Sequence, residues 1–171
     1  MFFYHCRCQR DGSLDNPGDN LEEECQRDGS ADILECSEST WDNSEIRIGI
    51  MGGTFNPPHY GHLQAAETAR ECLRLNKVIF VPSGKPPHKE SREVAGSEDR
   101  YNMVVAAIKN NPWFEASRIE IDREGPSYSV DTLRELKKIY GEKAKFYFII
   151  GSDIVNELTT WKEYEKLFRL C

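Results

Sequence analysis

The chain of 171 residues has no apolar run long enough to cross a membrane and no excess of positive charge. Its first four residues are apolar, but His5 and Arg7 end that run well short of the core of a signal peptide. Without a recognisable export signal, we expect a cytoplasmic protein. The 29 acidic residues outnumber the 22 basic ones, so no basic field favours binding to long nucleic acid.

The negative charge is confined to the first 44 residues. They contain 11 acidic and 3 basic residues, a net charge of −8, whereas residues 45–171 contain 18 acidic and 19 basic residues, a net charge of +1. Residues 1–44 also have few aliphatic side chains, and so cannot bury enough apolar surface to offset the entropy lost on folding. We therefore expect an acidic, disordered extension over residues 1–44 and a globular domain over residues 45–171.

Cysteine is concentrated in the same extension. Four of the six cysteines lie there, namely Cys6, Cys8, Cys25 and Cys36. Their spacing matches no common zinc finger, and His5 is the only histidine near them. Solvated thiols, which stay reduced in the cytoplasm, are therefore favoured over a zinc-binding module.

Apolar runs and helical periodicities alternate after residue 45. Short buried runs predict strands at residues 46–51, 78–81, 119–121 and 146–150. Helical spacing predicts helices over residues 63–73, from an N-cap at Ser97 to Asn110, and from an N-cap at Ser129, with Leu133, Leu136 and Ile139 on one face. This order predicts an α/β fold with a doubly wound parallel sheet and right-handed crossovers.

Three unusual loops follow predicted strands, at residues 52–62, 83–89 and 151–153. In such a sheet, ligands bind beyond the carboxyl ends of the strands. We therefore expect the three loops to converge on one cleft.

The first of these loops, GGTFNPPHYGH, contains the residues of a phosphate site. Gly52 and Gly53 have no Cβ, so the backbone can approach a phosphate closely, and Thr54 adds a hydroxyl. His59 and His62 are three residues apart at a helix start, where they can share a face and donate to one phosphate beside the free amides. The loop is neither a Walker motif nor a GxGxxG fingerprint. Two histidines and two glycines after a buried strand are difficult to explain by packing alone.

These eleven residues resemble the HxGH signature of the nucleotidyltransferase superfamily in its adenylyltransferase form. Three further stretches resemble the bacterial nicotinate-nucleotide adenylyltransferases: PSGKPPHK at residues 82–89, GPSYSVDTL at residues 125–133 and IGSDIVNELTTW at residues 150–161. The resemblance covers about residues 46–170 and implies a Rossmann-like nucleotidyltransferase fold.

The resemblance also implies the reaction, in which adenylyl transfer from ATP to nicotinate mononucleotide gives deamido-NAD and pyrophosphate. His59 and His62 would be catalytic, and Mg²⁺ would arrive with ATP. The implied ATP-binding residues are Gly52, Gly53, Thr54, Phe55, His59, His62, Gly151 and Asp153. The implied substrate-binding residues are Lys85, His88, Lys89, Tyr128, Thr132 and Trp161. Tyr128 and Trp161 also have a plain packing interpretation, and the lysine-bearing loop could simply be solvated.

Two other functions stay open at this point. Pantetheine-phosphate adenylyltransferases resemble the chain in the first loop and the sheet, although PSGKPPHK and the Trp161 segment argue against them. A non-catalytic nucleotide-binding fragment with an interaction role is the other alternative. It is favoured because the further strand and the Ser- and Arg-bearing motif that the resemblance implies for ATP phosphates do not follow residue 170. We therefore expect the 171-residue chain alone to have weak or no activity.

Overall fold

Four parallel strands form one sheet in the computed structural model, which describes residues 45–86, 94–151 and 154–171. The expected extension of residues 1–44 lies outside the described residues. The elements in chain order are β1 (Ile46–Gly53), α1 (Tyr60–Cys72), β2 (Lys77–Pro82), α2 (Ser97–Ile108), β3 (Phe114–Ala116), α3 (Ser129–Tyr140), β4 (Ala144–Ile149), the 3₁₀ helix η1 (Val155–Thr160) and α4 (Tyr164–Leu170).

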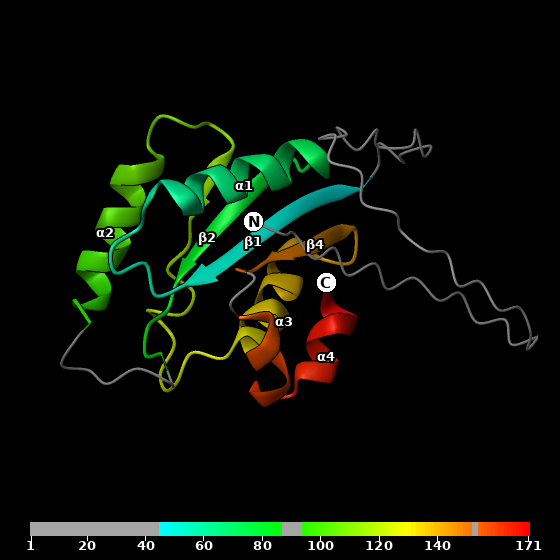
Figure 1. Ribbon diagram of the computed structural model, residues 1–171. Coiled ribbons are helices and arrows are strands. Elements are labelled where there is room, and N and C mark those ends of the chain that lie inside the picture. Colours follow the sequence, from blue (N-terminus) through cyan, green and yellow to red (C-terminus); the bar gives the residue numbers. More distant parts are fainter. Residues whose placement is uncertain (1–44, 87–93, 152–153) are drawn as a thin grey trace, which may run out of the picture.

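Strand β1 lies in the middle of the sheet, whose spatial order is β3-β2-β1-β4. Its residues 47–51 are buried, as expected for a strand covered on both faces. Helices α1 and α2 cover one face, where Ala66 and Val104 pack against Phe80, and α3 and α4 cover the other, where Leu133 and Leu167 pack against Ile48 (Figure 1). The doubly wound α/β class predicted from the sequence is confirmed.

The predicted third strand is wrong. The strand is Phe114–Ala116, which pairs with β2, whereas Ile119 and Ile121 belong to a turn. In that turn the backbone amide of Ile121 donates to the carbonyl of Arg118. Ile119 is partly buried against the core on the α3 side, so its apolar character reflects packing of a turn and not strand pairing.

Two predictions about helices also need correction. Ile139 is 67% exposed, because Tyr140, four residues after Leu136, takes the place against the core. The N-caps of α2 and α3 are Gly96 and Tyr128, one residue before the predicted serines. No helix in the described ranges has the length and apolar character that a membrane span requires.

The parallel arrangement brings the ends of the strands to one edge of the sheet. Gly53 at the end of β1 lies in register with Pro82 at the end of β2. On the other side of β1, Met51 pairs with Ile149 of β4, two residues before Gly151. The three loops of interest therefore start side by side.

Candidate functional site

The loop after β1 is anchored by Phe55. This side chain is 2% exposed and packs on Phe80, with ring centroids 5.9 Å apart, while His62 meets its edge at 5.0 Å. The ring also lies over Gly53, where an added Cβ would come within 3.2 Å of it. The structure thus places Phe55 beneath the loop as its anchor, and its predicted contact with ATP stays a prediction.

The rings of the two histidines of the loop lie against each other at the start of α1, with their planes inclined by 38°. Their ring centroids are 3.8 Å apart, and the backbone N–H of His59 donates to Nδ1 of His62 at 3.2 Å. Because Nδ1 accepts this bond, the neutral His62 ring carries its proton on Nε2, which is a donor. Gly61 leaves room for this arrangement, since a Cβ there would lie 3.0 Å from Nδ1 of His59.

The electrostatic environment favours the neutral form of His62. Burial, followed by the charge of protonated His59, lowers the pKa of His62 below its ordinary value. The folded protein therefore binds this proton less readily than the unfolded chain does. The stability that neutral His62 contributes is present above the ordinary histidine pKa of about 6.5 and is lost as the pH falls through the lower folded-state pKa.

The loop after β2 is tied directly to the loop after β1. Both the backbone N–H and the hydroxyl of Ser83 donate to the carbonyl of Gly53, at 2.9 and 3.1 Å. On its other side this loop contacts Ser127, whose Oγ accepts from the backbone amides of Gly84 and Lys85 at 2.9 and 3.2 Å. The Lys85 side chain itself is exposed. Three of the four stretches singled out in the sequence therefore meet at this point, namely residues 52–62, 82–89 and 125–133.

Arg100 of α2 lies beneath both loops with only 1% of its surface exposed. Its guanidinium donates to the backbone carbonyls of Thr54, Ser83 and Gly84, and its Nε donates to that of Ala95. The distances are 2.8 Å to Thr54, 2.6 Å to Ser83, 3.3 Å to Gly84 and 2.9 Å to Ala95. This arginine was not identified from the sequence, because an arginine on an amphipathic helix is usually solvated.

Aromatic side chains extend the site toward β4. Trp161 lies edge-on to Phe148 of β4, with centroids 6.2 Å apart and planes at 82°. Phe148 in turn reaches to 3.8 Å from where a Cβ on Gly52 would lie. The half-buried Trp161 is therefore linked to the glycine loop through one intervening ring.

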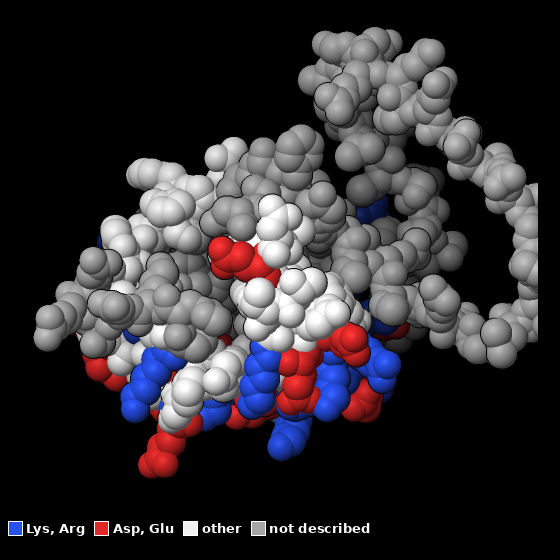
Figure 2. Space-filling model, turned by 60° about the horizontal axis from the view of Figure 1, so that its bottom comes forward, with Lys and Arg blue, Asp and Glu red and all other residues white. Residues whose placement is uncertain are grey.

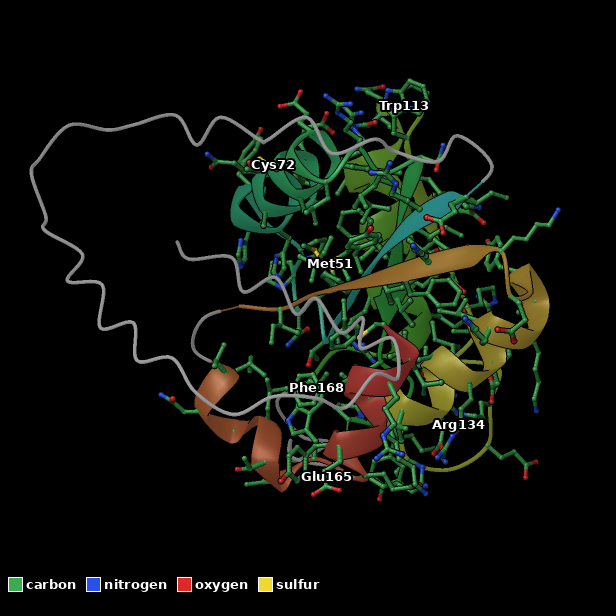
Figure 3. All side chains as sticks on the ribbon, turned by 90° about the vertical axis from the view of Figure 1, so that its right-hand side faces the viewer. Met51, Cys72, Trp113, Arg134, Glu165 and Phe168 are labelled. Carbon is green, nitrogen blue, oxygen red and sulfur yellow. The ribbon has the colours of Figure 1, made fainter. Side chains whose placement is uncertain are left out.

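Tyr128 lies at the start of α3 under a lysine. The ammonium of Lys162 lies 4.5 Å from the centre of the Tyr128 ring and pairs with Asp131 at 2.9 Å. Around this point, charged side chains of α3 pair with Lys162 and Glu163, which precede α4, and Figure 2 shows both signs side by side on the described part of that face. Figure 3 places Arg134 and Glu165 on the outer surface of these helices, well away from Met51 inside the molecule.

Thr132 faces the interior. It is 3% exposed, its hydroxyl donates to the carboxylate of Glu120 at 2.6 Å, and it accepts from Arg123 at 3.1 Å. Burial raises the pKa of Glu120, while hydrogen bonds from Thr132 and Ser127 counteract that shift. The structure gives the Thr132 hydroxyl protein partners, and its predicted contact with substrate stays a prediction.

Several predicted site residues fall outside the described part of the chain, namely His88, Lys89 and Asp153. Gly151 is described and exposed at the end of β4. Among the described residues, no group of three or more His, Cys, Asp or Glu side chains is placed to hold a metal ion.

These features define a class of protein. A doubly wound parallel sheet whose first loop carries two adjacent histidines and two glycines, joined to a lysine-bearing loop on the next strand, has the α/β fold of the nucleotidyltransferase type. A family model described as cytidylyltransferase-like matches residues 50–171, and the chain belongs to that family.

Two curated relatives show a similarity to a more specific group within this family. A protein of Thermoanaerobacter sp. (strain X514) is 56% identical over 127 residues, which cover 74% of this chain and 60% of the relative. One from Moorella thermoacetica is 55% identical over 125 residues, 73% of this chain and 58% of the relative. Both are named probable nicotinate-nucleotide adenylyltransferase, so the family predicted from the motifs is confirmed. The chain spans about 60% of the length of these relatives.

Solved structures share the fold. The chain is similar to Plasmodium falciparum nicotinic acid mononucleotide adenylyltransferase complexed with NaAD, with a TM-score of 0.63 and 23% identity over 72% of this chain and 60% of that one. A putative nicotinate-nucleotide adenylyltransferase from Vibrio parahaemolyticus gives a TM-score of 0.60 and 23% identity over 72% of each chain. At these identities the likeness concerns the fold alone.

We predict that His62 titrates below the ordinary histidine value of about 6.5. The His59→Ala variant should move the pKa of His62 upward but not fully back, because the neighbouring charge is removed while burial remains. The chain has four histidines, so ring signals in ¹H–¹³C correlation spectra can be followed against pH and assigned with His62→Asn. A wild-type midpoint for His62 at or above the ordinary value would contradict this prediction.

Substitution by alanine should affect stability at Gly84 and ATP binding at Gly52. At Gly84 a Cβ would lie 2.1 Å from the carbonyl oxygen of Glu120, so Gly84→Ala should lower the free energy of unfolding by about 1–3 kcal/mol. At Gly52 the nearest atom is 3.8 Å away, so Gly52→Ala should leave stability unchanged but weaken ATP binding about tenfold, because the methyl keeps phosphate off the backbone. Urea denaturation and calorimetric titration measure the two effects. Equal destabilisation of both variants, or wild-type ATP affinity in Gly52→Ala, would show the reasoning to be wrong.

Proposed function

We propose that this protein transfers the adenylyl group of ATP to nicotinate mononucleotide, forming deamido-NAD and pyrophosphate. The observation that carries the proposal is the direct hydrogen bonding of the loops after β1 and β2 through Ser83 and Gly53, with two adjacent histidines on one side and the exposed Lys85 on the other. A reaction between two phosphate-bearing substrates needs two such loops at one edge. The names of the curated relatives support the same substrates.

In the proposed reaction, a phosphate oxygen of nicotinate mononucleotide attacks the α-phosphorus of ATP. The bond from that phosphorus to the oxygen bridging to the β-phosphate breaks, and pyrophosphate leaves with the electron pair. Catalysis of such a step consists mainly of alignment and of stabilising charge on the phosphate oxygens. His62 contributes Nε2–H, His59 lies on the same face, and the free amides of α1 add positive potential.

Lys85 and Trp161 supply the other half of the proposed site. The exposed ammonium of Lys85, together with His88 and Lys89, would bind the attacking phosphate, and Trp161 would lie against the flat pyridine ring. Tyr128 would border this ring. Thr132 positions α3 through its bond to Glu120, and its contact with the substrate remains part of the proposal.

Magnesium fits this arrangement as a companion of ATP. Mg²⁺ keeps several waters and is usually bound through one or two carboxylates and the substrate phosphates, so it needs no cage built entirely from protein. Asp153, which follows β4 in the sequence, would provide such a carboxylate, and the ion would offset negative charge on the phosphates. We also infer a cytoplasmic location, where ATP is available, and a nucleotidyltransferase domain over residues 45–171 preceded by an extension.

The purified chain should bind nicotinate mononucleotide, and any dinucleotide that it forms with ATP and Mg²⁺, even at a low rate, should be deamido-NAD. Lys85→Ala should weaken nicotinate mononucleotide binding about tenfold, because one charge-assisted contact is removed. Lys109→Ala is the matched control, since Lys109 is exposed at the far end of α2. Calorimetric titration measures binding, and liquid chromatography with mass spectrometry identifies the product.

Phosphopantetheine serves as the competing acceptor in the same assay. Adenylylation of phosphopantetheine without binding or conversion of nicotinate mononucleotide would contradict the proposal and favour the pantetheine-phosphate reaction. Binding of ATP with no binding of either acceptor would favour a nucleotide-binding role without transfer.

A further inference from the structure

The backbone of residues 83–85 makes hydrogen bonds through all of its polar groups. The N–H of Ser83 donates to Gly53, and those of Gly84 and Lys85 donate to Oγ of Ser127. The carbonyls of Ser83 and Gly84 accept from Arg100, and the carbonyl of Lys85 accepts from the backbone N–H of Ser127. Three N–H groups and three carbonyls are thus bound within the protein.

This saturation determines how the loop can meet a ligand. A phosphate cannot use the backbone amides of this loop unless the bonds to Ser127 break, because each N–H already donates. The loop cannot shift toward the turn at residues 119–121 either, since Gly84 already lies against the backbone of Glu120. The exposed Lys85 side chain is therefore the group that these three residues can offer to an anion.

Arg100 connects this loop to the one after β1. The same terminal group donates to Thr54 on the histidine side and to Ser83 and Gly84 on the lysine side. A planar guanidinium holds its donors in a rigid fork, so these carbonyls are kept at a fixed separation. A lysine at this position would keep the charge, but its single nitrogen could not span both loops.

We propose that Arg100 is a positioning residue, which holds the loop at Thr54 and the loop at Ser83–Lys85 in one fixed relation so that Lys85 faces the phosphate of the second substrate. From the opposite side, Ser127 also holds the loop at Ser83–Lys85, because its Oγ accepts from the amides of Gly84 and Lys85. This inference rests on the proposed function for the identity of the ligands. It adds that the two half-sites are aligned by one side chain that contacts neither ligand.

Selective effects on the two ligands test the proposal. Ser127→Ala should weaken nicotinate mononucleotide binding about tenfold and leave ATP binding unchanged, because Ser127 contacts the lysine loop. Ser127→Thr keeps the hydroxyl and should restore binding. Arg100→Lys should weaken the binding of both ligands, because Arg100 contacts both loops. Calorimetric titrations are made at a temperature where circular dichroism shows each variant to be folded, so general destabilisation cannot produce this pattern.

Matched controls use the same changes at neighbouring surface positions. Arg118→Lys alters an exposed arginine that pairs with Glu98, and Ser117→Ala removes a hydroxyl that accepts from Ile119. Both should bind the two ligands as the wild type does. Wild-type binding of both ligands by Arg100→Lys and Ser127→Ala would overturn the proposal.

Amide hydrogen exchange separates this inference from the proposed function. The amides of Gly84 and Lys85 should be protected in the wild type and exchange faster in Ser127→Ala and Arg100→Lys. If the wild type failed to bind nicotinate mononucleotide, the proposed function would be wrong, but the exchange rates would still decide whether the loop is held. Rapid exchange of both amides in the wild type would refute the positioning role.

Discussion

The buried guanidinium of Arg100 is the interaction on which the arrangement of the site depends. Removing a charged group from water costs several kcal/mol unless its donors find acceptors, and here the acceptors are four backbone carbonyls from three loop segments. Those carbonyls meet only when the loops after β1 and β2 are both in place. Burial lowers the pKa of Arg100, and the negative charge of Glu120 opposes that shift.

The chemistry of the site depends on which polar groups the surrounding structure leaves free to contact a ligand. On one side the backbone of the lysine loop is fully bonded, so charge is presented by the exposed Lys85. On the other side, burial and the proximity of His59 keep His62 neutral, with Nδ1 occupied and Nε2 as the donor. Under the proposed function, the two substrates would be bound by different means, the exposed ammonium of Lys85 for one phosphate and oriented neutral donors for the other. This asymmetry suits a reaction in which one phosphate attacks and the other loses its leaving group.

Features governed by local sequence were predictable, and those that depend on distant contacts were not. The strands β1, β2 and β4 were predicted because their apolar runs are nearly continuous, and the shared face of His59 and His62 follows from helical spacing. The third strand was misplaced because Ile119 packs from a turn, while the true strand is only 3 residues long. Arg100 and Ser127 were missed as site residues, although Ser127 lies within the GPSYS stretch, because their partners in the loops after β1 and β2 are 16 to 46 residues away in sequence.

The central claim is that two ligand half-sites lie side by side and are held by one buried side chain. Chemical-shift mapping of the ¹⁵N-labelled chain tests it most directly, with nicotinate mononucleotide and a non-hydrolysable ATP analogue added separately. Nicotinate mononucleotide should shift the amide signal of Lys85 and the indole N–H signal of Trp161. The ATP analogue should instead shift the amide signals of Gly52 and His62. Shifts of the same residues by both ligands, or of none of these four, would contradict it.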